Sequence, residues 1–255
     1  MLIDPLFISH GAPDVLVRDT PAHHALASLA LTPGTRAVLV VSAHWEADPV
    51  RVQTAPAPST IHDFSGFGPE LARAVYDAPG APDLAAAVIE RLKAAGLAAG
   101  AEPQRGRDHG AWIPLALMHP DARIPVFQVS LPASDDAAIA LGKALAPLSR
   151  DRVQIIGSGA LTHALGAALP AAEDAPAHPD ALAFADWIRP RLASGDTDTI
   201  AGWRSAPAAR FNHPTPEHFR PLLVAMAAGG GQAGTCLHQS WSRSALAMDI
   251  WRFAA

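Results

Sequence analysis

Short apolar runs, each about as long as one strand, alternate along this 255-residue chain with segments of helical periodicity. Runs rich in β-branched and aliphatic residues cover positions 2–9, 37–42, 50–54, 124–131 and 153–157, with a last candidate near 244–253. The helical patterns cover positions 81–96, 136–148, 180–192 and 217–228. Because strands that alternate with helices of this length form βαβ units, the order predicts an α/β fold. We expect a largely parallel or mixed central sheet with helices on both faces.

Length and composition limit the classes of protein to consider. No linker interrupts the pattern, so we expect one domain over residues 1–255. No apolar stretch reaches the roughly 20 residues of a membrane helix, and the net charge of −5 without a cluster of basic residues argues against nucleic acid. The beginning of the chain lacks the features of a signal peptide, so we expect a cytoplasmic protein. Cys236, the single cysteine, is expected in the core.

Three of the twelve histidines follow predicted strands, namely His10, His44 and His163. In an α/β protein, residues just past the carboxyl ends of buried strands line the crevice where ligands bind, so these imidazoles could converge. A neutral imidazole is the commonest metal ligand, and rigid elements are needed to place it. The pattern therefore indicates a metal site, although a single histidine at a strand end is more often a structural residue.

A further candidate lies in the proline-rich segment 212–218. Thr215 resembles an N-cap and Pro216 the first residue of a helix, which would place His218 in the first helical turn. The helix dipole there disfavours protonation of the imidazole and so suits metal ligation. The alternative is an ordinary solvated helix start.

Two histidines are candidates for proton transfer, because an imidazole titrates near pH 7. His163 follows a strand and a predicted turn at 157–159, and His109 stands just before a predicted helix. Asp108 would cap that helix or orient His109, and the cap is the more common role. The long aperiodic segment 56–68 indicates a functional loop. Nucleophile-elbow, P-loop, dinucleotide-binding and HExxH patterns are absent from the sequence.

With these residues assembled, the chain resembles the class III extradiol ring-cleavage dioxygenases, in particular the 4,5-DOPA extradiol dioxygenase-like branch. The resemblance covers nearly the whole chain in order. It is carried by the segments PLFISHGAPD, VVSAHWE, STIHDFSGFGPELARAVYDAPGAPDLA, RGRDHGAWIPLALMHPDARIPVFQVSL, IIGSGALTH and NHPTPEHFRPLL.

This resemblance implies one divalent metal ion per chain, normally Fe(II) and in some relatives Zn(II). By position it implies metal ligands at His10, His44 and His218, and it makes His163 either a further ligand or the acid/base residue. His109 resembles a histidine that contacts the substrate.

The resemblance also places His213 against the substrate pocket. His62, Phe64, Phe67 and Trp45 could shape this pocket, although core packing is the more common role for the aromatic residues. Arg18, Arg105 and Arg107 are candidates for holding a substrate carboxylate.

The expected activity is that of an oxidoreductase that opens the ring of a catechol with O2 to give a semialdehyde. The catechol would be DOPA or a related catecholic acid, and a homo-oligomer is possible. The alternatives are a zinc-dependent hydrolase on the same scaffold and a metal-binding protein without turnover. The ligand set separates them, because oxygen-activating iron sites commonly use two histidines and a carboxylate, whereas the sequence offers His218 as third ligand. An all-histidine site also suits zinc.

Overall fold

The computed structural model describes residues 2–255 and has a six-stranded mixed sheet at its centre. In spatial order the strands are β5 (Val126–Gln128), β2 (Ala37–Ser42), β6 (Val153–Gly159), β1 (Leu6–Ser9), β10 (Ile250–Phe253) and β7 (Gly234–His238). The first four strands are parallel, β10 runs antiparallel to β1, and β7 runs antiparallel to β10. The predicted α/β fold with a mixed sheet is therefore confirmed.

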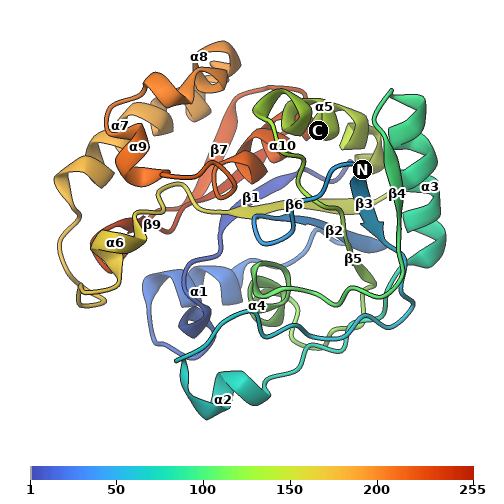
Figure 1. The fold of residues 1–255 in the computed structure, drawn as a ribbon, viewed down its shortest axis with the longest axis horizontal. Helices are drawn as coiled ribbons and strands as arrows, with labels where there is room; N and C mark the ends of the chain where they lie inside the picture. Colours follow the sequence, from blue (N-terminus) through green and yellow to red (C-terminus); the bar gives the residue numbers. More distant parts are fainter. Residues whose placement is uncertain (1) are drawn as a thin grey trace.

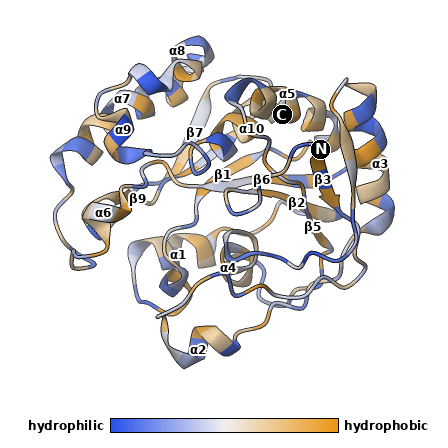
Figure 2. Cartoon of the chain, in the orientation of Figure 1, coloured by the Kyte–Doolittle hydropathy of each residue, from blue (hydrophilic) through white to orange (hydrophobic). Residues whose placement is uncertain are grey.

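Helices cover both faces of this sheet (Figure 1). On one face lie α3 (Pro82–Ala94), α5 (Asp135–Leu145), α7 (Pro179–Ser194) and α10 (Arg220–Ala228), and on the other α1 (Pro21–Ser28) and α4 (His109–Met118). Side chains of β2 alternate between the two layers, as the pleat of a strand requires. Leu39 and Val41 pack on the first side, and Val38 and Val40 on the second. Figure 2 shows the apolar strands inside this arrangement.

The remaining elements are short and lie around the sheet. They are β3 (Val50–Gln53), α2 (Gly68–Arg73), β4 (Ala99–Glu102), α6 (Leu165–Ala168), α8 (Thr197–Ala201), α9 (Ala209–Asn212), β8 (Trp241–Ser242), β9 (Leu246–Ala247) and 3-10 helices at Pro13–Leu16, Ala146–Ser149 and Trp203–Ser205. None of the helices in the described part of the chain combines the length and apolar character that crossing a membrane requires.

Two edge regions differ from the sequence-based expectation. The predicted strand at 50–54 lies outside the central sheet, where β3 pairs in parallel with β4. The sequence of β4, AGAE, lacks the β-branched residues that mark a strand, so the sequence patterns do not predict it. Cys236 was expected in the core and is instead exposed, because β7 is the edge strand of the sheet.

The prediction of a turn at 157–159 is wrong, because these residues form the end of β6. Their glycines serve a different purpose. A Cβ atom on Gly157 would lie 2.1 Å from the carbonyl oxygen of Pro221, and one on Gly159 would lie 2.2 Å from that of His218. The missing side chains therefore allow the segment 218–221 to pack directly on the strand.

The helix expected from Glu217 begins later, at Arg220, so His218 lies in the turn that precedes α10. The carbonyl of Pro216 accepts hydrogen bonds from the amides of Phe219 and Arg220. The next hydrogen bond in this pattern would run from the amide of residue 221 to the carbonyl of Glu217. Pro221 has no amide proton, so this bond cannot form, and α10 begins as a separate helix.

Candidate metal centre

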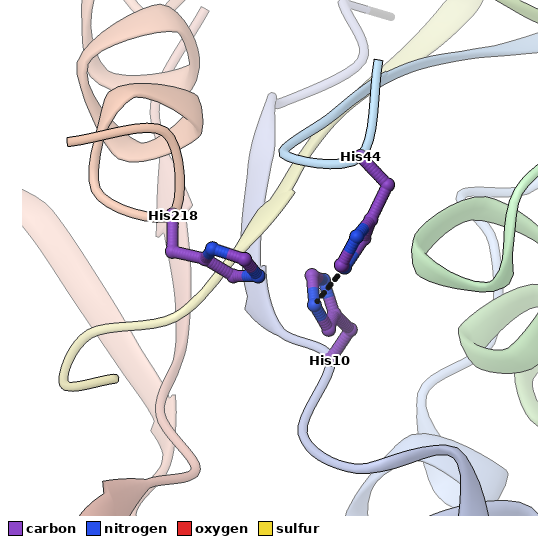
Figure 3. A group of neighbouring side chains, drawn as sticks. All are labelled: His10, His44 and His218. Atoms are coloured by element: carbon purple, nitrogen blue, oxygen red, sulfur yellow. Dashed lines mark hydrogen bonds between the residues drawn. The ribbon is translucent and has the colours of Figure 1, made fainter. Parts of the chain in front are cut away.

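Three histidines converge at the carboxyl ends of the parallel strands (Figure 3). His10 follows β1 directly, His44 follows β2, and β6 lies between these two strands. His218 approaches from the turn before α10. The Nε2 atoms of His10 and His44 are 3.1 Å apart, and one ring nitrogen from each histidine lies within 4.8 Å of the others. The strand order thus brings together residues that are distant in the sequence.

The separation of the His10 and His44 nitrogens fits a single metal ion. Two imidazole ligands with bonds of about 2.0–2.1 Å place their nitrogens about 3–3.4 Å apart, depending on the angle at the metal. Nε2 of His218 is buried and has no hydrogen-bond partner among the described residues. A buried polar atom without a partner is costly, and a cation at this position would remove that cost.

The hydrogen bonds around the cluster determine which ring nitrogens carry protons. The hydroxyl of Ser158 donates to the carbonyl of Gly110, so it must accept from Nδ1–H of His10, 2.9 Å away. The carboxylate of Glu217 accepts from Nδ1–H of His218 at 3.0 Å. Both rings therefore direct an unprotonated Nε2 toward the centre of the cluster, as metal ligation requires.

The electrostatics of the cluster favour neutral imidazoles. Burial, reinforced by neighbouring imidazoles, lowers the pKa values of His10 and His218 well below the ordinary range. Burial also lowers the pKa of His44 to about 4. Little proton release would then be needed for these three residues to bind a metal at neutral pH.

A carboxylate that the sequence analysis did not assign lies beside the cluster. One oxygen of Asp63 accepts a hydrogen bond from the backbone amide of His109 and lies 3.0 Å from its Nδ1, and the other lies 3.9 Å from Nδ1 of His44. Burial opposes ionisation of Asp63, but its contacts with His109 prevail and lower the carboxyl pKa to about 2. Asp63, His44 and His109 form a second group of potential ligands, with two imidazoles and one carboxylate.

The prediction that the side chain of Asp108 caps α4 is wrong. The first amide of α4 donates to Asp63, and the side chain of Asp108 makes no cap hydrogen bond. Asp108 is instead fully buried and accepts hydrogen bonds from Ser42 at 2.7 Å and Gln128 at 2.8 Å. It connects the end of β2 to the end of β5 beneath the cluster.

His163 lies beside His218, with ring centroids 3.5 Å apart and the planes nearly parallel. Burial lowers its pKa to about 4, although Glu217 opposes this shift. Among the described residues, neither ring nitrogen of His163 has a hydrogen-bond partner, so both are free to meet a ligand.

A cavity of about 300 Å³ opens over these residues. Five histidines line it, namely His10, His44, His109, His163 and His218. Phe64 and Phe67 of the loop at 56–68 also line it, in agreement with the functional loop expected there. A concave site of this size suits a small organic ligand.

The three other residues predicted to bind substrate lie outside this cavity. His62 packs against Phe64 and contacts the carbonyl of Ala74. His213 is buried behind the site, where its Nε2 contacts the carbonyl of Leu161 at 2.9 Å. Trp45 is buried beneath the guanidinium of Arg105. We therefore do not assign these three residues to the substrate.

The arginines considered for a substrate carboxylate also lie elsewhere. Arg107 is fully buried and donates to five backbone carbonyls, which fixes the loop before α4. Arg105 contacts Asp108 and the carbonyl of His44. Arg18 pairs with Asp14 in the same turn. Each guanidinium group is already bound to acceptors of the protein, and none of the three arginines lines the cavity.

Two further residues of the site carried little signal in the sequence. A Cβ on Gly110 would lie 2.5 Å from the hydroxyl of Ser42 and 3.1 Å from His44, so only glycine fits between them. Its position next to His109 was the available clue. Met248 lines the cavity from the C-terminal region, and only the fold brings it there.

Together, the fold and the site define a histidine-rich α/β protein that could hold a metal ion beside a ligand cavity. The family described as the catalytic LigB subunit of aromatic ring-opening dioxygenase matches residues 7–253, and the chain belongs to this family. The resemblance inferred from the sequence motifs is thereby confirmed.

Relatives and a solved structure agree with this assignment. The chain is 38% identical to a 4,5-DOPA dioxygenase extradiol of Beta vulgaris, over 99% of this chain and 97% of that protein. It is 34% identical to one of Escherichia coli K12, over 89% of this chain and 85% of the relative. A crystal structure of an uncharacterized E. coli K12 protein matches with a TM-score of 0.78 and 25% identity, and covers 99% of this chain and 100% of that one.

Proposed function

We propose that the protein is an extradiol dioxygenase that opens the ring of a catechol with O2, at a metal ion held by His10, His44 and His218. The observation that carries this proposal is the convergence of three imidazole nitrogens on the wall of a cavity, in a member of a ring-opening dioxygenase family. The relatives named 4,5-DOPA dioxygenase extradiol support extradiol cleavage. Nothing in the comparisons favours a zinc-dependent hydrolase, and we do not propose one.

The ion in this proposal is Fe(II). When bound, it would supply the Lewis acidity that favours an ionised catechol and the redox activity that O2 chemistry needs. Iron is proposed because cleavage by O2 needs a redox-active ion, which zinc is not. Asp63 is not among the proposed ligands, since it lies near Nδ1 of His44 and not near the Nε2 atom that faces His10.

Two histidines would handle the protons of the catechol. Asp63 contacts Nδ1 of His109, which leaves Nε2 of that ring to accept a hydrogen bond from a hydroxyl group. His163 has both ring nitrogens available and a lowered pKa, so it is neutral at pH 7 and can accept a proton. After ring opening, the same nitrogen can return that proton to the product. The apolar cavity wall limits access of water during this exchange.

The test is aerobic incubation of the Fe(II)-loaded protein with a panel of catechols, measured by O2 uptake and the yellow absorbance of the semialdehyde. We expect His44→Ala to lose both metal and activity. His163→Ala should keep its metal but lose activity by about 10²–10⁴-fold, the usual contribution of a general base.

His24→Ala, at an exposed histidine on α1, is the matched control and should resemble the wild type. Absence of O2 uptake with every catechol would refute the proposed function. Loss of metal from His163→Ala would instead make His163 a ligand.

A further inference from the structure

Apart from its histidines, the cavity is lined almost entirely by apolar side chains. Prominent among them are Pro13, Phe64, Phe67, Leu165, Leu246 and Met248. Of the described residues that line the cavity, none is a lysine, arginine, aspartate or glutamate.

The two hydroxyl groups in the lining are already used by the protein. Thr162 donates to the carbonyl of Ala245 and accepts from the amide of Ala247. Ser9 accepts from the amide of Leu161 and is 2% exposed. Neither side chain is therefore placed to bind a charged group of a substrate.

Nearby cations are neutralised by carboxylates of the chain. Arg18 and Arg243 both pair with Asp14, and Arg243 also contacts Glu173. Releasing one of them to a substrate carboxylate would leave Asp14 or Glu173 with a weaker partner, so the exchange offers little net gain.

The apolar character continues to the mouth of the cavity. Leu165 and Leu169 line the cavity and yet are 43% and 67% exposed, so they lie at its edge. A charged substituent held against this surface would lose hydration without gaining a partner, whereas an apolar substituent would bury area favourably.

On the basis of the proposed catechol cleavage, we propose that the preferred substrate is a catechol with an uncharged apolar substituent, such as a short alkyl or aryl group. The histidines and the metal would bind the two catechol oxygens, and the substituent would lie against Phe64, Phe67 and Leu165. The sequence led us to expect DOPA or another catecholic acid, and the lining of this cavity favours a different substituent.

The test compares kcat/KM of the Fe(II)-loaded protein for catechol, 4-methylcatechol, 4-ethylcatechol, L-DOPA and 3,4-dihydroxyphenylacetate. Each methylene should raise kcat/KM about three- to fourfold until the cavity is filled, as expected from burying one CH₂ group. The two charged catechols should be poorer than 4-ethylcatechol by at least about 100-fold. Equal or higher kcat/KM for L-DOPA would overturn this inference while leaving catechol cleavage intact, whereas no turnover of any catechol would refute the proposed function itself.

A pair of variants tests the wall directly. Leu165→Arg places a cation at the mouth of the cavity and should raise kcat/KM for 3,4-dihydroxyphenylacetate relative to 4-ethylcatechol by at least about tenfold. Leu165→Gln, which adds polarity without charge, should not change this ratio in favour of the acid. An unchanged ratio in Leu165→Arg, in a variant whose thermal melting shows it to be folded, would mean that the substituent does not contact this wall and would overturn the inference.

Binding gives a second readout that needs no turnover. Calorimetry of the Zn(II)-loaded protein should show tighter binding of 4-ethylcatechol than of L-DOPA, with a negative heat-capacity change from apolar burial. Tighter binding of L-DOPA would contradict the proposed substituent.

Discussion

Three of the imidazoles at the site contact a polar neighbour through Nδ1. Ser158 and Glu217 hold the Nδ1 protons of His10 and His218, and Asp63 contacts Nδ1 of His109. Such partners orient the ring and expose the opposite nitrogen. At His10 and His218 this leaves an unprotonated Nε2 facing the cluster, as the proposed metal ligation requires.

A buried histidine behind the site should make stability depend on pH. Burial lowers the pKa of His213 to about 4, against 6.5 for the unfolded residue. As the pH falls from 6.5 to 4, the unfolded chain takes up a proton that the folded chain excludes, so stability decreases by about 2 kcal/mol at pH 5. In His213→Gln, which can still donate to the carbonyl of Leu161, this contribution should vanish.

The measurement is urea unfolding of the metal-free wild type and His213→Gln at pH 7.5 and pH 5. His213 is neutral in both states at pH 7.5, which serves as the reference. Identical changes in the free energy of unfolding for the two proteins would show that His213 is not the residue responsible.

The sequence was informative about single residues when they followed a recognisable element. His10 and His44 come after apolar runs, so their position at one edge of the sheet could be predicted. Asp63 could not, because it lies in an aperiodic loop and meets His109 only through the fold. Substrate contacts were the least predictable from the sequence. His62 and His213 each lie in a segment that resembles the family motifs, but neither side chain lines the cavity.

Among the elements, the contact between β6 and the turn before α10 does most to place the third histidine. Gly157 and Gly159 let this turn lie directly on the strand, and the amide of Ala160 donates to the carbonyl of His218 at 2.9 Å. The strands and longer helices were predictable from periodicity. The close approach of β6 and the turn before α10 was not predictable, because a Gly-Ser-Gly sequence is equally typical of a turn.

We expect Gly159→Ala to displace His218. The added Cβ would lie 2.2 Å from the carbonyl oxygen of His218, so the turn must move. Metal affinity should fall by at least about tenfold, within the range seen when the support of a ligand is lost. Equilibrium metal titration is the measurement.

Gly166→Ala provides the matched control, because a Cβ there meets nothing within 4 Å and the residue lies in α6. It should bind metal as the wild type does. If both variants retained full affinity, the glycines of β6 would not be responsible for placing His218.

For the molecule as a whole, two apolar layers enclose a sheet whose parallel strands end at the site. The alternation of strands and helices predicted this architecture. It did not predict the edges, where β4 and β7 lack continuous apolar runs and pair only because neighbouring strands are present. Local sequence patterns carry little information about such pairings.

Metal binding should stabilise the entire fold, because one ion would join segments at residues 10, 44 and 218. At a free metal concentration of 100 times Kd, the stabilisation is about 3 kcal/mol, which corresponds to roughly 5–12 °C in Tm for a protein of this size. Thermal unfolding with metal and with a chelator measures this shift. His44→Ala should show almost none of it, and an equal shift in that variant would place the stabilising ion elsewhere.

The position of β1 has a consequence for biosynthesis. This strand is made first, yet its two neighbours are β6 and β10, and the last of these ends at Phe253. Contacts so distant in sequence form slowly, and a nascent chain exposes His10 long before His218 leaves the ribosome. A metal ion held by all three histidines of the proposed site would therefore have to enter after residue 218 has been synthesised.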